Sequence, residues 1–306
     1  MGASTGGAAP MNHPARLTIG VVGAGRVGAV LGAALAGAGH RVIGWSGVAQ
    51  ASYDRAAALL PGVPRREPDE LARRADLLLL AVPEDVMADL VSGLAATGAV
   101  RPGQLVVHTA GRFGIDVLGP ATRLGALPIA LHPVVSFTGT AVDLLRLRGA
   151  MVAVTAPLVL RPVAQALVLE MGSECEFVAE PARPLLHAAL AQAADHLTTL
   201  VAESAELLSA CGVSDPARML APLLQAAVEN ALRSGDRALA GPVVRADAET
   251  VGAHLAAIGT ISPRAAAAYR AMARLTADRA LAAGLLPAEQ AAGLLEVLGD
   301  PVLGDG

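Results

Sequence analysis

The sequence predicts an α/β domain, built on a doubly wound parallel sheet and followed by an all-α domain. In the first part of the chain, short apolar runs that suit buried strands alternate with helical patterns, which is the order that produces a parallel sheet. From Pro181 onward the apolar runs of strand length stop, and helical patterns follow one another. We therefore divide the chain into a flexible tail over residues 1–15, a sheet domain over 16–180 and a helical domain over 181–306.

The predicted strands are continuous apolar runs, because a strand that helices cover on both faces has no polar side. They cover residues 17–22, 40–45, 75–82, 104–109, 126–131, 150–155 and 176–178. Helices are predicted between these runs over residues 27–38, 52–60 and 162–171. This alternation of strand and helix is the basis of the predicted sheet domain.

Four helices are predicted in the second domain, and the residues at their ends support the assignment. The first covers residues 185–210 and is followed by Gly212, where a glycine is expected after a helix. The second begins with Asp215 as cap and Pro216 at the first helical position, and it continues to about residue 235. The last two cover residues 247–258 and 263–283.

Composition excludes several classes of function. The 306 residues are 54% hydrophobic, and the net charge of -4 with a pI near 6.0 indicates neither a nucleic-acid partner nor a membrane surface. All 23 basic residues are arginine, so no lysine can act as proton donor or Schiff-base former. Cys175 and Cys211 are isolated, which fits a cytoplasmic protein and predicts no metal site. No signal peptide or membrane span is expected.

The most informative motif lies between the first predicted strand and the first predicted helix, and reads Gly23-Ala24-Gly25-Arg26-Val27-Gly28. Gly23 permits a tight turn, Gly25 lets the backbone approach a diphosphate, and Gly28 allows the helix to pack closely on the sheet. The start of the helix, at Arg26 and Val27, offers unpaired N–H groups and the positive end of the helix dipole. The motif therefore predicts a dinucleotide-binding βα unit of the Rossmann type.

A second cofactor contact is expected after the second predicted strand. Most NAD-binding proteins place an acid there against the ribose hydroxyls, whereas this chain has Trp45-Ser46-Gly47. Without an acid to repel it, the 2′-phosphate of NADP can be accepted by Ser46, with Arg55 as counter-charge. NADP is therefore favoured over NAD. The alternative is that Ser46 only belongs to a turn and that either coenzyme binds.

Histidines are the candidate proton donors of the sheet domain. His108 and His132 stand at the ends of predicted strands, on the edge where ligands of open α/β sheets bind. A histidine there can give a hydrogen bond or a proton to the atom that gains negative charge as hydride arrives, although either residue can also be structural. Of the two, His108 is assigned to the cofactor-binding residues. His187 and His196 are nine positions apart on one helix, so they cannot both point into one cleft.

In the helical domain, candidate residues gather at the start of the third predicted helix. Asp247 is interpreted first as an N-cap, and Thr250 and His254 share a helix face one turn apart. Arg245 can grip a substrate carboxylate through two hydrogen bonds, or it can form a surface ion pair. Asp195, on the first long helix, is a candidate proton donor if it faces the cleft with a raised pKa.

Three sequence segments carry a resemblance to known families. They are residues 107–111, residues 131–133 with 137–139, and residues 241–247 with Thr250 and His254. On these segments the chain resembles the group of 6-phosphogluconate dehydrogenase and pyrroline-5-carboxylate reductase. It resembles more closely the bacterial Rossmann-like proteins whose C-terminal half is a helical domain of unknown function. The resemblance extends from residue 16 to about residue 294.

The resemblance implies a nicotinamide coenzyme with Val82 and Pro83 under its ribose and His132 beside the nicotinamide. It also implies a homodimer formed through the helical domain. The substrate that it implies first is ketopantoate, followed by pyrroline-5-carboxylate and other imino acids. The chain departs from the family pattern at Ala246, where a glycine is usual, and at Asp195, where an asparagine is usual.

From these observations we predict an NADP-dependent oxidoreductase that reduces the C=O or C=N group of a small carboxylated metabolite. Arg245 would hold the carboxylate, and His132 or His254 would stabilise the developing anion. In the wider dehydrogenase group a lysine often stands where this chain has Ala191, so a lysine-assisted mechanism cannot be carried over. The alternative is a non-catalytic NAD(P)-binding sensor or assembly protein.

Overall fold

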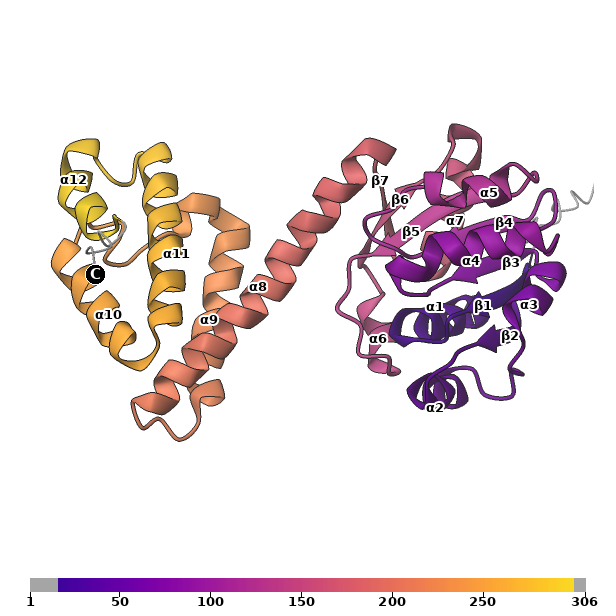
Figure 1. Cartoon of the computed structure of the whole chain (residues 1–306), viewed down its shortest axis with the longest axis horizontal. Coiled ribbons are helices and arrows are strands. Elements are labelled where there is room, and N and C mark those ends of the chain that lie inside the picture. Colours follow the sequence, from indigo (N-terminus) through magenta and orange to yellow (C-terminus); the bar gives the residue numbers. More distant parts are fainter. Residues whose placement is uncertain (1–15, 300–306) are drawn as a thin grey trace, which may run out of the picture. The chain divides into compact units, whose positions relative to one another are not determined.

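The computed structural model describes residues 16–299 (Figure 1). The chain forms two compact units, which divide between Ala194 and Asp195, inside a long helix. The tail predicted over residues 1–15 lies outside the described residues. Within residues 16–299, every helix is either too short or too polar to cross a membrane.

The first unit is built on a seven-stranded sheet with the strand order β2-β1-β3-β4-β5-β6-β7. The strands are β1 (Thr18–Val22), β2 (Arg41–Ser46), β3 (Leu77–Leu80), β4 (Leu105–His108), β5 (Leu127–Pro133), β6 (Met151–Thr155) and β7 (Glu174–Phe177). The predicted doubly wound sheet is confirmed, and β1 to β5 are parallel.

One strand direction differs from the predicted all-parallel sheet, because β6 runs antiparallel to β5. The connection over residues 134–150 contains only the short helix α6 (Val142–Arg146). A parallel crossover needs a dozen or more residues, usually in a helix, to carry the chain back along the sheet. Here the connection instead re-enters the sheet at the edge where β5 ends.

Alternate residues of the central strands supply two cores, one on each face of the sheet. Leu77 and Leu79 of β3 belong to the first core, and Leu78 and Leu80 belong to the second. Three helices complete the first core, namely α1 (Arg26–Gly37), α2 (Gln50–Leu59) and α7 (Arg161–Glu170). Three others complete the second core, namely α3 (Pro68–Arg74), α4 (Glu84–Ala96) and α5 (Gly119–Thr122). This two-sided burial explains why the strands are apolar throughout.

The second unit is helical, as predicted. It contains the end of α8 (Arg183–Ala210), then α9 (Pro216–Ser234), α10 (Ala248–Ile261), α11 (Pro263–Ala282) and α12 (Ala288–Val297). Its core is formed by α10, α11 and α12. The predicted cap of α9 is confirmed, since the Asp215 side chain accepts a hydrogen bond from the Arg218 N–H at 3.0 Å. Helix α12 is absent from the predicted elements.

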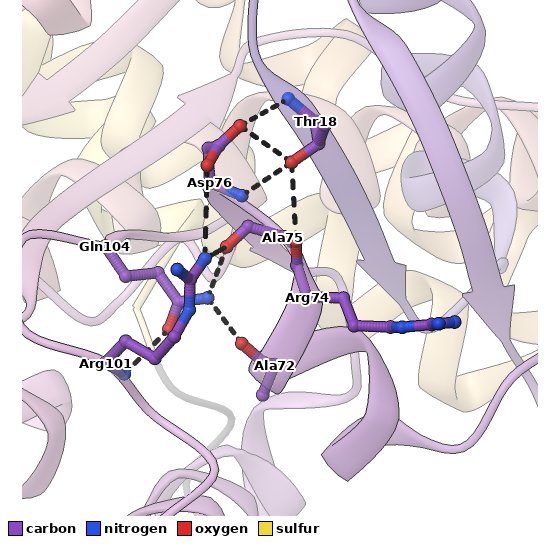
Figure 2. A network of polar contacts seen from close by, with 7 residues as sticks. All are labelled: Thr18, Ala72, Arg74, Ala75, Asp76, Arg101 and Gln104. Atoms are coloured by element: carbon purple, nitrogen blue, oxygen red, sulfur yellow. Dashed lines mark hydrogen bonds and ion pairs between the residues drawn. The ribbon is translucent and has the colours of Figure 1, made fainter.

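A polar network fixes the edge of the sheet at which β1, β3 and β4 begin (Figure 2). The Asp76 carboxylate accepts hydrogen bonds from the N–H and the hydroxyl of Thr18, at 2.9 and 2.7 Å, and they hold the pKa of Asp76 below its usual value. The buried Gln104 amide donates to the carbonyls of Ala72 and Ala75, at 2.6 and 2.7 Å. This network holds the register of three strands at the edge opposite to the one where ligands bind.

Candidate cofactor site and active site

The glycine motif lies in the tight turn between β1 and α1, and its three glycines meet different surroundings. Gly23 has a φ of 95°, and a β-carbon there would lie 2.5 Å from the Ala81 carbonyl oxygen. A β-carbon on Gly28 would collide with the Gly23 carbonyl and lie 2.8 Å from Cβ of Ala81. A β-carbon on Gly25 would meet no atom within 4 Å. The fold itself therefore requires Gly23 and Gly28, while Gly25 leaves open space beside the backbone.

Gly25 stands directly before the start of α1, a position that suits an anion. Gly25 is the N-cap of α1 and provides no side-chain cap. The N–H groups of Arg26, Val27 and Gly28 lie in the first turn, where an α-helix supplies no backbone acceptor. A diphosphate can accept these hydrogen bonds and is favoured by the helix dipole. The residues present therefore fit the diphosphate group of a dinucleotide.

Ser46, at the end of β2, holds the glycine turn in place. Its carbonyl oxygen accepts hydrogen bonds from the N–H groups of Gly23 and Ala24, at 3.2 and 2.7 Å. Its hydroxyl oxygen lies 3.3 Å from the Gly23 nitrogen, and the side chain is buried. Ser46 thus belongs to the turn, and its hydroxyl hydrogen stays able to donate to a ligand. Val82 packs on the same turn, with Cγ1 3.1 Å from a β-carbon built on Gly23.

The loop after β4 is fixed by carboxylates from two other segments. Pro83 is the N-cap of α4, and the next residue, Glu84, accepts hydrogen bonds from the N–H groups of Gly111 and Arg112 at 2.7 and 3.2 Å. Glu180, before α8, accepts them from Ile115 and from the residue after it, at 2.6 and 3.2 Å. Because these loop N–H groups are satisfied by side chains, the loop has a defined shape at the ligand-binding edge.

His108 shapes the same loop from inside. Its ring is fully buried, and Nδ1 accepts a hydrogen bond from the Ala110 N–H at 3.2 Å. Nε2 must then carry the proton, which it donates to the Gly114 carbonyl at 2.6 Å. Burial lowers the pKa of His108 to about 4. Both ring nitrogens are engaged, so the ring can contact a cofactor only by losing one of these bonds; the structural alternative describes His108 best.

His132 differs, because within residues 16–299 only one of its ring nitrogens has a hydrogen-bond partner. Nδ1 donates to the Thr109 carbonyl at 3.2 Å, which leaves Nε2 as the free nitrogen of the neutral ring. Burial lowers the pKa of His132, and the positive charge of Arg183 and the neighbouring His187 add to the effect. The ring lies edge-to-face with His187, with 6.0 Å between ring centroids. The ring is thus held in one orientation, and Nε2 is available to a ligand.

Two residues of this site, His187 and Arg183, were not among the predicted site residues. Of the two histidines on α8, His187 lies against His132, whereas His196 is exposed. Arg183, one turn before His187, is fully buried and donates to Thr155 Oγ1 at 2.8 Å and to the carbonyls of Ala130 and Ala153 at 3.1 and 3.0 Å. Burial lowers the pKa of Arg183 to about 10. These bonds tie the start of α8 to β5 and β6.

In the second unit, Asp247 is the N-cap of α10, as first interpreted. Its carboxylate accepts hydrogen bonds from the N–H and the hydroxyl of Thr250, at 3.0 and 2.7 Å, and these bonds lower the pKa of Asp247. The Thr250 hydroxyl is therefore already engaged. His254 is exposed, and its Nδ1 lies 2.8 Å from the Tyr269 hydroxyl. Arg245 is exposed just before the cap, and Asp195 is exposed on α8.

Comparison with known proteins identifies both halves of the chain. Residues 4–133 match the sequence profile of a Rossmann-like domain, and residues 150–276 match that of DUF2520, a domain of unknown function. These matches agree with the resemblance inferred from the motifs. No curated protein sequence matches the chain significantly.

Several solved structures share the fold over most of the chain. A Bacteroides fragilis protein, provisionally named an NADP oxidoreductase, has a TM-score of 0.73 at 20% identity over 86% of this chain and 98% of that one. Streptomyces aurantiacus imine reductase has a TM-score of 0.62 at 15% identity over 92% and 100%. Plasmodium falciparum pyrroline carboxylate reductase, solved with NADP bound, has a TM-score of 0.54 at 12% identity over 86% and 98%.

Proposed function

We propose that this Rossmann-like protein with a C-terminal DUF2520 domain is an NADP-dependent reductase of a C=N or C=O group in a small carboxylated metabolite. The observation that carries the proposal is the open space at Gly25 beside the start of α1, which fits a diphosphate. The solved structures named as imine and pyrroline carboxylate reductases support a C=N substrate. The substrate that the family resemblance implies first, ketopantoate, carries a C=O group. Substrates with a C=N group and substrates with a C=O group are therefore both tested.

The preference for NADP rests on the arginines near the glycine turn. Arg26 and Arg55 both approach Gly139, and neither pairs with a carboxylate among residues 16–299. Unpaired arginines beside a dinucleotide turn suit the extra phosphate of NADP. Ser46 adds a hydroxyl at the end of β2 and no charge that would repel that phosphate.

His132 is the proton donor in this proposal. Bound NADPH would supply the hydride for the carbon of the substrate double bond, so a proton would have to reach the nitrogen or oxygen. The Thr109 carbonyl holds the Nδ1–H of His132, so Nε2 is the nitrogen that would take up a proton from water and pass it to the substrate. Because burial lowers the pKa of His132, the protonated ring is a stronger acid than a histidine in water. His187 restricts the rotation of the ring from one side.

Residues of the helical unit complete the proposal. Arg245 is exposed and can bind the substrate carboxylate, and His254 is the second candidate for the proton donor.

A homodimer is also proposed. Three apolar side chains of α9 are 55%, 65% and 85% exposed, and a second copy would cover them: Met219, Leu223 and Leu232.

The decisive experiment combines binding with turnover. Calorimetry measures the binding of NADPH and NADH, and the fluorescence of Trp45, which directly precedes Ser46, provides a second signal. Oxidation of NADPH is then followed with cyclic imines, imino acids and 2-oxo acids that carry a carboxylate. If the protein is a reductase, NADPH is oxidised with one of these substrate classes. The His132→Gln variant should then lose this oxidation and still bind the coenzyme as the wild type does. Binding without any oxidation would favour the sensor instead.

The helical residues are tested with the same substrate. Arg245→Ala and His254→Ala are expected to lower turnover and to leave NADPH binding intact. Wild-type rates in both variants would remove these residues from the site.

A further inference from the structure

The segment of residues 134–141, between β5 and α6, forms a strap at the ligand-binding edge of the first unit. Since β6 is antiparallel to β5, this segment stays at the edge where β5 ends instead of crossing the sheet. It leads into α6, which contacts α1 directly (Figure 1). The strap therefore brings a part of the chain far from the glycine turn to the start of α1.

A buried carboxylate gives the strap its shape. The Asp143 side chain is 0% exposed and accepts hydrogen bonds from the N–H groups of Thr138 and Gly139, at 2.8 and 2.7 Å. It also accepts one from the Thr138 hydroxyl at 3.1 Å and one from Arg146 at 3.0 Å. Burial alone would raise the pKa of Asp143, but these bonds outweigh it and the pKa is lowered. The carboxylate is thus charged and fully bonded, and it fixes the position of Gly139.

Gly139 is the point where the strap meets the two arginines. Its φ is 81°, and a β-carbon there would lie 2.6 Å from Nε of Arg55 and 3.0 Å from Cγ of Arg26. Arg26 comes from the first turn of α1 and Arg55 from α2, so three separate segments converge. Neither arginine has a carboxylate partner among residues 16–299; Arg26 is exposed and Arg55 is partly exposed, so both guanidinium groups can reach a ligand.

We propose that the strap is one wall of the subsite that selects the 2′-phosphate of NADP, and that Gly139 and Asp143 are positioning residues for Arg26 and Arg55. The ligand class is a phosphate monoester on a ribose, next to the diphosphate at the start of α1. The inference rests on the proposed function for the coenzyme, and it adds which residues discriminate NADP from NAD. Only glycine at position 139 lets the backbone lie this close to both arginines.

The experiment measures the dissociation constants of NADPH and NADH by calorimetry for the full-length chain and for Gly139→Ala. The added methyl group must displace Arg55, so binding of NADPH is expected to weaken about tenfold or more while binding of NADH changes by less than about twofold. Gly149→Ala is the matched control. Gly149 also has a positive φ, 74°, but a β-carbon there meets no atom within 4 Å, so both constants should stay unchanged.

Arg55→Gln decides the question if Gly139→Ala does not fold, because it removes the charge without burying a new group. It should weaken NADPH binding selectively, and the double variant should lose little more affinity than either single variant, since Gly139→Ala acts mainly by displacing Arg55. If a variant loses the same affinity for NADPH as for NADH, or if neither variant loses affinity, the inference is wrong and the proposed function still stands. A wild-type chain that binds neither coenzyme would overturn both.

Discussion

Gly25 and Gly28 belong to one motif, yet the structure predicts opposite effects for their replacement by alanine. At Gly25 the backbone has a φ of −75°, which alanine adopts freely, and the new β-carbon meets no atom within 4 Å. The stability loss should stay below about 1 kcal/mol, the difference between glycine and alanine as N-cap. The methyl group would instead occupy the space that a diphosphate needs, so binding of NADPH should weaken by about 3 kcal/mol, roughly a hundredfold.

At Gly28 the new β-carbon would collide with the Gly23 carbonyl and with Ala81, and backbone atoms cannot rotate away. Overpacking against fixed atoms costs about 3 kcal/mol, which corresponds to a decrease in Tm of about 6 to 12 °C for a domain of this size. Thermal unfolding followed by circular dichroism, with calorimetry of NADPH binding, separates the two variants. The reasoning would be refuted by a folded Gly25→Ala protein that binds NADPH within about threefold of the wild type.

Two further predictions concern stability. Ala246 has a φ of 55°, a left-handed backbone that strains a side chain, so Ala246→Gly should raise the free energy of unfolding by about 0.5 kcal/mol. Ala248→Gly, at the start of α10, should lower it instead. Changes of the same sign in urea unfolding would contradict this. His108 has a pKa of about 4 in the folded protein and of 6.5 as its ordinary value. The contribution of its neutral ring to the free energy of unfolding is therefore complete above pH 6.5 and is lost as the pH falls toward 4. Between pH 6.5 and 5 the wild type should lose about 2 kcal/mol more than His108→Gln, and equal losses would show that the ring is not held neutral.

The phosphate half of the site could be predicted from the sequence because the backbone alone forms it. Gly23 and Gly28 are required by a positive φ and by close approach, and both requirements leave a fixed local spacing in the chain. The other half depends on contacts between distant segments. Glu84 bonds to a loop 27 residues later, and Glu180 bonds to one 65 residues earlier. No local pattern marks such a carboxylate, so neither residue was predicted.

The direction of strand β6 and the presence of helix α4 were also not predicted from the sequence. An apolar run predicts a strand but not its direction, which is why the antiparallel β6 was unexpected. Helix α4 separates two predicted strands and has no counterpart among the predicted helices. For His187, the spacing from His196 showed that only one of them can face a given cleft, and choosing between them required the position of α8 on the sheet.

Hydrogen bonds already engage most charged groups of the ligand-binding edge, which supports the proposal that His132 is the proton donor. Loops after parallel strands carry N–H groups that neither sheet nor helix satisfies, and one carboxylate can accept two of them. Glu84, Glu180 and Asp143 are engaged in this way, and Arg183 donates to carbonyls and a hydroxyl. Such bonds offset the free energy lost when a charge is buried, and they fix the loops before any ligand arrives. In the proposed mechanism His132 stands among these fixed groups, with no partner for Nε2 within residues 16–299, and its lowered pKa makes the protonated ring a stronger acid than a histidine in water.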